Sequence, residues 1–184
     1  WILQAERNGT GHAVRTAMPG VEDESSLLVL YGDAPLVNPD TLRRAVATAE
    51  SGEVAIVTAH AVDPTGYGRI LRDASGSVTA IREQKDASPD EQAVTEFNSG
   101  FMAAPSARLR GWLNALRSDN AQGELYLTDV VELAIADGVP VTAVVADNEA
   151  EIAGVNDRGQ LAQLERVYQS RMADHLMRSG VTLA

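Results

Sequence analysis

The feature that most constrains the fold is the alternation of short apolar runs with stretches of helical period along the chain. SSLLVLYGD (25–33) and EVAIVTAHA (53–61) have the length and composition of buried strands. Between them, NPDTLRRAVATAESG (38–52) has helical spacing, with Asn38 as N-cap and Gly52 as stop. Strands that alternate with helices favour crossover units, so we predict the α/β class with a Rossmann-like, mostly parallel sheet.

The remaining segments extend this pattern and add one insertion. WILQA (1–5) predicts a further strand. Between 63 and 84, YGRILRD, the turn-like ASGS and VTAIREQ predict an antiparallel β-hairpin, and the polar stretch 85–96 predicts a loop. A long helix is predicted from 157 to 178. A length of 184 residues suits one domain with its own core.

Charge and composition narrow the possible partners. Lys and Arg number 15 against 26 Asp and Glu, and this net charge of -11 disfavours a nucleic-acid partner because phosphates are repelled. A nucleoside triphosphate substrate would need a divalent cation or a local basic cluster. The chain has no cysteine and no run of about 18 apolar residues, so we expect no disulfide, no membrane partner and a cytoplasmic location.

One carboxylate stands where ligands gather in open α/β sheets. The apolar strand ends in Tyr31, Gly32 and Asp33, and ligands bind outside the carboxyl ends of such strands. Gly32 would let the backbone approach a ligand, and Asp33 offers a hard oxygen suited to Mg²⁺. A simpler interpretation stays open, in which Asp33 only caps the following turn.

Two further polar segments flank predicted helices. NGTGHA places Gly9 and Gly11 at a helix start, where free N–H groups could hold a phosphate or a polar ring, although a plain turn would use the same glycines. The sequence contains no dinucleotide fingerprint and no P-loop. In GVNDR, Asn156 precedes the last helix, where an N-cap role is the alternative to a ligand role.

Seven segments follow one another in a specific order along the chain. They are WILQAERNGTGHA, LYGDAPL, DPTGYGRI, EQKDA, FNSGF, NAQGELYLTD and AGVNDRGQLAQLERVYQ. Together they resemble the uridyltransferase domain of the bacterial bifunctional N-acetylglucosamine-1-phosphate uridyltransferase / glucosamine-1-phosphate acetyltransferase family, over essentially the whole chain. The resemblance implies a nucleotide-diphospho-sugar transferase fold.

The resemblance also implies a reaction and a cofactor. The phosphate of N-acetylglucosamine 1-phosphate would attack the α-phosphorus of UTP and give UDP-N-acetylglucosamine, a cell-envelope precursor, and pyrophosphate. Nucleotidyl transfer needs in-line positioning and cancellation of developing negative charge, which a divalent metal can supply. The implied cofactor is Mg²⁺, with Asp33 and Asn156 as its ligands and as the catalytic residues.

Further positions match the family's substrate contacts. The implied binding residues are, for uracil, Gln4, Gly9 and Thr10; beside the nucleotide, Tyr31, Gly32 and Asp33; for the N-acetylglucosamine moiety, Gly68, Glu83 and Asn98; and near the sugar phosphate and metal, Tyr126, Thr128 and Asn156. Glu83 would accept hydrogen bonds from sugar hydroxyls, and Asn98 could donate or accept them.

The chain departs from the family pattern at its two ends. The family's domain opens with a strand and a glycine-rich loop that carries an arginine, with a lysine further on, and its acetyltransferase half is a β-helix. We therefore expect residues 1–184 to form a partial uridyltransferase domain, with 157–184 leading toward an absent β-helix. Because the family forms homotrimers through that β-helix, we expect this fragment to be monomeric, and inactive alone.

Two other functions remain open. One is nucleotidyl transfer to another sugar 1-phosphate, because spacing does not prove a pocket for an acetamido group. The other is a non-catalytic module that binds sugar nucleotides, which would need Gln4, Glu83 and Asn98 but not the metal pair of Asp33 and Asn156. The presence of that pair favours the enzyme.

Overall fold

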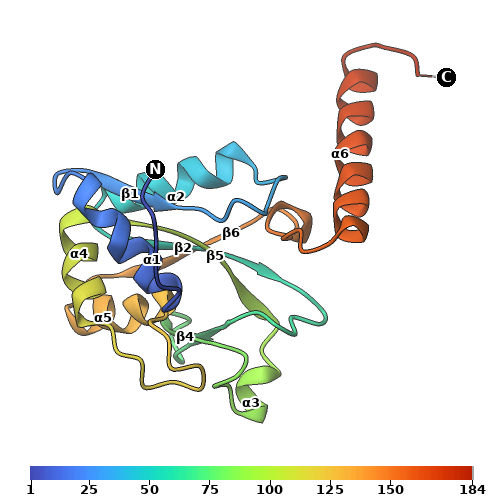
Figure 1. Ribbon diagram of the computed structural model, residues 1–184. Helices are drawn as coiled ribbons and strands as arrows, with labels where there is room; N and C mark the ends of the chain where they lie inside the picture. Colours follow the sequence, from blue (N-terminus) through green and yellow to red (C-terminus); the bar gives the residue numbers. More distant parts are fainter. Residues whose placement is uncertain (184) are drawn as a thin grey trace.

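The computed structural model describes residues 1–183 as one β-sheet between two helical layers (Figure 1). Helix α2 (Pro39–Glu50) packs against one face, where Ala45 and Ala49 are buried. Helices α4 (Ser106–Ala115) and α5 (Val130–Ala136) cover the other face, and α1 (Thr10–Ala17) packs on α4. The core is therefore split into two apolar clusters, one on each side of the sheet.

Strand β5 is the centre of the sheet. The strands of the described residues are β1 (Ser26–Val29), β2 (Val54–His60), β3 (Arg69–Arg72), β4 (Val78–Arg82), β5 (Glu96–Pro105) and β6 (Val141–Val145). Their order is β4-β3-β5-β2-β6, and β1 also pairs with β5. Because β1 and β2 both pair with Met102 and Ala103, they lie on opposite edges of β5. One strand thus holds three others in place.

The α/β class and the β-hairpin are confirmed, whereas the mostly parallel sheet is wrong. The hairpin pairs β3 with β4 in antiparallel register, with Arg69 opposite Arg82. Strand β5 runs antiparallel to its neighbours β1, β2 and β3, and the only neighbouring strands of the described sheet that pair in parallel are β2 and β6. A parallel neighbour needs a crossover, usually a helix, but the chain reaches β5 from β2 through the hairpin. The insertion therefore reverses the direction of β5.

Two of the predicted strands also differ in the structure. The segment 1–5 forms no strand, because no described strand lies beside it to pair with its N–H and C=O groups, and Trp1 and Leu3 are exposed. The strand predicted within 25–33 exists as β1, but it is half-buried rather than buried and stops at Val29. Leu30, the next residue, is 44% exposed.

The helix boundaries follow their capping residues. The Asn38 side chain accepts a hydrogen bond from Asp40 N at 3.0 Å and starts α2. The stretch 85–96, predicted as a loop, contains the short helix α3 (Pro89–Gln92), because Ser88 and Glu91 form a capping box. The 3-10 turns are η1 (Met18–Gly20), η2 (Leu127–Asp129) and η3 (Glu149–Glu151).

The predicted last helix is confirmed as α6 (Arg158–Arg178), which extends away from the rest of the molecule (Figure 1). Asp157 is its N-cap and accepts from Gln160 N at 2.8 Å. Leu164 is its one buried residue, whereas Tyr168 is 52% exposed. Within residues 1–183, no helix has both the length and the apolar character needed to cross a membrane.

Strand β5 begins with the buried carboxylate of Glu96, which pairs with the exposed residue Arg72. Arg72 donates from Nε and Nη2 to the two carboxylate oxygens of Glu96, each at 2.7 Å, and Thr58 Oγ1 donates to Glu96 Oε1 at 2.9 Å. Burial opposes the charge of Glu96, but the hydrogen bonds from Arg72 and Thr58 outweigh it and lower the pKa of Glu96. This carboxylate links β2, β3 and β5.

We expect Glu96→Gln to lower the free energy of unfolding at neutral pH by roughly 1–3 kcal/mol, because it weakens a charged, doubly bonded contact. The folded-state pKa lies below the unfolded value, so this contribution is present above the unfolded pKa and is lost as pH falls through the folded pKa. Urea unfolding at a series of pH values from about 7 to about 3, which spans the range in which carboxyl groups titrate, measures this contribution. Glu50→Gln, at an exposed site, is the control. An equal pH dependence in Glu96→Gln and the parent protein would contradict the assignment.

Candidate active site

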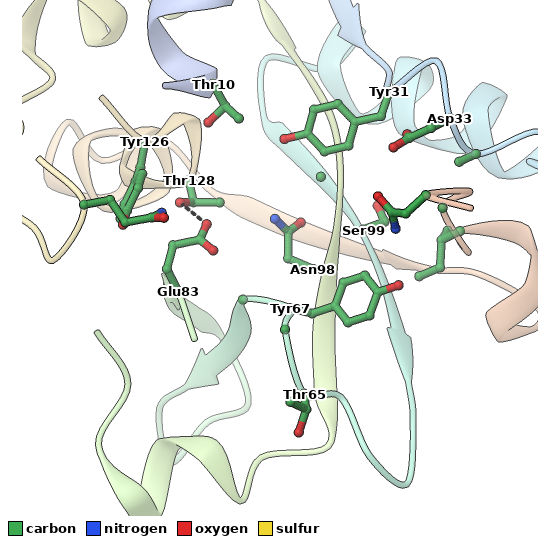
Figure 2. Close-up of a pocket in the computed structure, with 18 of the residues that line it drawn as sticks. Thr10, Tyr31, Asp33, Thr65, Tyr67, Glu83, Asn98, Ser99, Tyr126 and Thr128 are labelled. Atoms are coloured by element: carbon green, nitrogen blue, oxygen red, sulfur yellow. Dashed lines mark hydrogen bonds between the residues drawn. The ribbon is translucent and has the colours of Figure 1, made fainter. Parts of the chain in front are cut away.

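A cavity of about 540 Å³ opens beside the middle of β5. Its lining residues are Thr10, Tyr31, Asp33, Ala34, Thr65, Gly66, Tyr67, Gly68, Glu83, Asn98, Ser99, Gly100, Gln122, Glu124, Tyr126, Thr128, Ile152, Gly154, Asn156 and Gln160. Figure 2 shows Glu83, Tyr126 and Thr128 on one side, Asp33 on the other, and Asn98 between them. The cavity therefore draws its walls from segments that lie far apart in the sequence.

The floor of the cavity is the stretch Asn98, Ser99 and Gly100 of β5. The register between β2 and β5 shifts between Ile56 and Thr58, opposite this stretch. Ser99 Oγ donates to Val57 O at 2.7 Å and accepts from Phe101 N at 3.0 Å. These two bonds replace regular ladder bonds and hold the irregular backbone in place.

Gly100 leaves the space that Tyr31 occupies. Gly100 has φ of 86°, and a Cβ there would stand 2.0 Å from Tyr31 Cε2. The Tyr31 ring also meets Phe101 edge to face, with centroids 6.4 Å apart. Burial first, and then the charges of Glu83 and Asp33, raise the pKa of Tyr31. Tyr31 is thus held over the floor as a neutral phenol.

We expect Gly100→Ala to destabilise the protein by more than the roughly 1–2 kcal/mol of a left-handed alanine, because the Tyr31 ring must also move. Gly52→Ala is a matched control, since Gly52 has φ of 94° but no atom within 4 Å of the position that a Cβ would take. Urea unfolding compares the free energies of unfolding of the two variants. Titration with a ligand then tests whether the substitution at Gly100 alters binding in the cavity. Equal destabilisation by both substitutions would show that Tyr31 adapts freely.

Glu83 and Thr128 form the acidic side of the cavity. Thr128 Oγ1 donates to Glu83 Oε1 at 2.8 Å (Figure 2). Burial raises the pKa of Glu83, the bond from Thr128 opposes this, and Asp86 adds to the rise. Burial, followed by the charges of Glu132 and Glu83, raises the pKa of Asp129 to about 6. This side of the cavity is rich in oxygen acceptors.

Asp33 lies on the other side of the cavity, in contact with the segment 154–156 that carries Asn156. Val155 N donates to Asp33 O at 2.9 Å, and a Cβ at Gly154 would stand 3.6 Å from Asp33 Oδ2. Within residues 1–183, the Asp33 carboxylate receives no hydrogen bond, and Asp157 rather than Asn156 caps α6. The capping interpretations of both side chains are therefore excluded, and both remain available to a ligand.

The donor set fits a hard divalent cation that is shared with a phosphate ligand. Asp33 offers carboxylate oxygens and Asn156 an amide oxygen, which suit Mg²⁺. Among the side chains described, no three His, Cys, Asp or Glu residues cluster to hold a metal. Mg²⁺ commonly binds one or two protein oxygens, with water and phosphates as its other ligands. The two residues would therefore hold the ion only together with substrate.

A buried carboxylate supports the loop of Asn156. Glu151 is 1% exposed, and it accepts from Thr41 Oγ1 at 2.9 Å and from Asn148 Nδ2 at 3.2 Å. Thr41 lies in the first turn of α2, whereas Glu151 closes η3, just before Gly154. This contact fixes the segment that carries Asn156 to the body of the fold.

The structure brings most of the predicted binding residues into this one cavity. The predicted residues that line it are Thr10, Tyr31, Asp33, Gly68, Glu83, Asn98, Tyr126, Thr128 and Asn156. Gln4, Gly9 and Gly32 are outside the lining. The side-chain nitrogen of Gln4 lies 3.0 Å from His12 Nδ1 and 3.4 Å from Gly9 O. At Gly9 a Cβ would stand 2.5 Å from Leu125 O, so this glycine permits the close approach of two backbones.

Several lining residues were missed by the sequence interpretation. Tyr67 and Gly100 lie within the segments DPTGYGRI and FNSGF, next to residues that were assigned, and Gln122 and Glu124 lie in NAQGELYLTD. For Tyr67 and Gly100, the glycine-rich segments in which they lie are the sequence signal that could have identified them. No local pattern distinguishes Gln122 or Glu124 from an ordinary polar loop.

Comparisons with known proteins agree with this architecture. The chain is 54% identical over 183 residues to the bifunctional protein GlmU of Azotobacter vinelandii. The aligned region covers 100% of this chain and 40% of that relative. It is 54% identical over 184 residues to bifunctional protein GlmU of Burkholderia multivorans, with 100% and 41% covered. The chain thus spans about two fifths of the length of the curated relatives it matches.

A solved structure and a family pattern extend the comparison. The crystal structure of UDP-glucose pyrophosphorylase complexed with UDP-glucose superposes with a TM-score of 0.70 at 12% identity, covering 91% of this chain and 64% of that one, which supports the fold alone. Residues 1–170 match the pattern described as nucleotidyl transferase. With a match across nearly all of its length, the chain belongs to the nucleotidyl transferase family.

Proposed function

We propose that the protein transfers the uridylyl group of UTP to N-acetylglucosamine 1-phosphate, with Mg²⁺, and releases pyrophosphate. The observation that carries this proposal is one cavity with Asp33 on one side, Glu83 on the opposite side and Asn98 between them (Figure 2). Asn156 also lines this cavity, and Val155, its neighbour in the chain, is hydrogen-bonded to Asp33. The hard oxygens of Asp33 and Asn156 suit a metal ion that in turn binds phosphates, whereas the acceptors on the other side suit sugar hydroxyls. The relatives named GlmU support this assignment.

The reaction needs positioning rather than covalent help from the protein. An oxygen of the sugar phosphate forms a bond to the α-phosphorus of UTP as the bond from that phosphorus to the bridging oxygen of the β-phosphate breaks. That oxygen leaves with the pyrophosphate. Holding the two phosphates in line supplies much of the rate enhancement. In this proposal Glu83 and Asn98 fix the sugar, and Tyr31 and Thr10 bound the nucleotide side.

Charge explains why a metal belongs to the proposal. The cavity lining, as far as the chain is described, includes Asp33, Glu83 and Glu124 but no Lys, Arg or His. In a protein of net charge -11, such a lining would repel a triphosphate. Mg²⁺, held by Asp33 and Asn156, would neutralise phosphate charge and stabilise charge that develops during transfer.

The function is tested by release of pyrophosphate from UTP in the full natural protein that carries this chain. We expect release to require both Mg²⁺ and N-acetylglucosamine 1-phosphate, with UDP-N-acetylglucosamine identified by mass spectrometry. Glucose 1-phosphate in place of the acetamido sugar tests the alternative substrate. Stronger turnover with glucose 1-phosphate would assign another sugar. Binding of UDP-N-acetylglucosamine without any turnover would instead favour a non-catalytic module.

A further inference from the structure

Arg69 is a buried cation that the reaction above does not use. It is the first residue of β3 and only 2% exposed, although it does not line the cavity. Within residues 1–183 it enters no ion pair with a carboxylate, and its Nε has no acceptor. Burying a charge without an opposite charge is costly. Its remaining contacts must therefore hold it in place.

Those contacts form a closed bridge between two walls of the cavity. Arg69 Nη1 donates to Tyr67 O, and Arg69 Nη2 donates to Gln84 Oε1 at 2.8 Å. The same Gln84 oxygen accepts from Gly66 N at 3.2 Å. One guanidinium and one amide thereby tie the turn 65–68 to the residue that follows Glu83.

Both ends of this bridge carry residues of the sugar side. Gly68 O accepts from Asn98 N at 2.8 Å, so the turn is fixed to the floor as well. A Cβ at Gly68 would stand 2.9 Å from Ile81 Cγ2 and 3.5 Å from Glu83 Oε2. Figure 2 shows Tyr67, Asn98 and Glu83 around the same cavity. A shift of the turn would therefore move the groups that surround a sugar.

We propose that Arg69 is a positioning residue that sets the turn 65–68 against Gln84 and thereby determines affinity for the sugar half of the substrate pair. This inference rests on the proposed function. Arg69 acts through Tyr67 and Gln84 and does not touch the ligand. The planar fork of an arginine can reach both acceptors at once, whereas a lysine offers a single charged nitrogen. The bridge therefore requires the planar guanidinium group of arginine and not only its positive charge.

The test is steady-state kinetics of the full natural protein with Arg69→Lys, Arg69→Met and Gln84→Leu. We expect each variant to raise KM for N-acetylglucosamine 1-phosphate about tenfold, while KM for UTP changes less than about twofold. The double variant Arg69→Met/Gln84→Leu should be no worse than the more affected single variant, because both remove one bridge. Gln84→Leu also covers the case in which Arg69→Met does not fold.

Arg72→Met is the matched control, because Arg72 lies in the same hairpin but pairs with Glu96 away from the cavity. It should lower thermal stability and leave both KM values unchanged. Unchanged KM values in the Arg69 and Gln84 variants, or equal increases for both substrates, would overturn the inference, and so would full activity of Arg69→Lys. If the parent protein itself does not catalyse the transfer, the proposed function fails instead.

Discussion

Replacing Asp33 with Asn should lower turnover at least about a thousandfold in the full natural protein. A bound metal supplies several kcal/mol of stabilisation to developing charge, and each 1.4 kcal/mol or so corresponds to about a tenfold change in rate. Asn keeps the shape of the side chain but removes its charge. Because the Asp33 carboxylate has no hydrogen-bond donor among the residues described, the substitution should leave the free energy of unfolding nearly unchanged. The loss should therefore belong to ligand binding and not to folding.

Metal binding should be measured separately from turnover. Mn²⁺, used as a paramagnetic substitute, should bind more weakly to Asp33→Asn in the presence of UTP, as followed by electron paramagnetic resonance. Asp40→Asn is the control, because Asp40 is exposed on α2 and, among residues 1–183, its carboxylate pairs with Arg43 alone. Parent-like kinetics of Asp33→Asn at limiting Mg²⁺ would contradict the metal assignment.

Replacing Glu83 with Ala should raise KM for N-acetylglucosamine 1-phosphate by about a hundredfold and KM for UTP far less. The substitution removes hydrogen bonds in which a charged group takes part, each of which contributes roughly 1.5–3 kcal/mol. It also leaves Thr128 Oγ1 without its acceptor. Glu83→Gln keeps an oxygen for Thr128, so it should lose less. Equal losses for both substrates would indicate a structural role for Glu83.

The pH profile gives a second measure of Glu83. Burial raises its pKa, so Glu83 is protonated at a higher pH than an exposed glutamate, and protonation removes acceptor capacity. KM for the sugar phosphate should therefore rise as pH falls, and Glu83→Gln should flatten this rise. Asp129, with a pKa of about 6, titrates nearby, and Asp129→Asn separates its contribution. A rise that persists in Glu83→Gln but disappears in Asp129→Asn would assign the profile to Asp129.

Local patterns were sufficient for the long helices α2 and α6 and for the existence of most strands, whereas the short helix α3 was missed. Asn38 and the apolar spacing behind it specify α2 because capping and amphipathic period are properties of neighbouring residues. The direction of β5 cannot be predicted from neighbouring residues, since it depends on how the chain returns from the hairpin to the sheet. The segment 1–5 has strand-like composition, but a strand also needs a partner, and composition does not supply one.

The residues of the candidate site also fall into two groups, those that a local pattern predicts and those that depend on contacts between distant parts of the chain. Asp33 was predictable because it follows an apolar run at a sheet edge, and the family resemblance added Glu83, Asn98 and Asn156. The contact between Thr41 and Glu151 joins residues 110 positions apart, and no local pattern announces it. Arg69 is similar, because its hydrogen bonds run to one backbone carbonyl and one amide and leave no charge pattern in the sequence.

The central position of β5 bears on how such a protein could acquire a new substrate. The floor of the cavity belongs to the strand that holds β1, β2 and β3, so a substitution there alters both the ligand site and the sheet. The turn 65–68 and the loop that carries Gln122 and Glu124 line the same cavity without carrying a strand. Changes of sugar preference are therefore easiest to reach through the loop that carries Gln122 and Glu124, because the turn 65–68 has no space for a side chain at Gly68 and is held by Gln84.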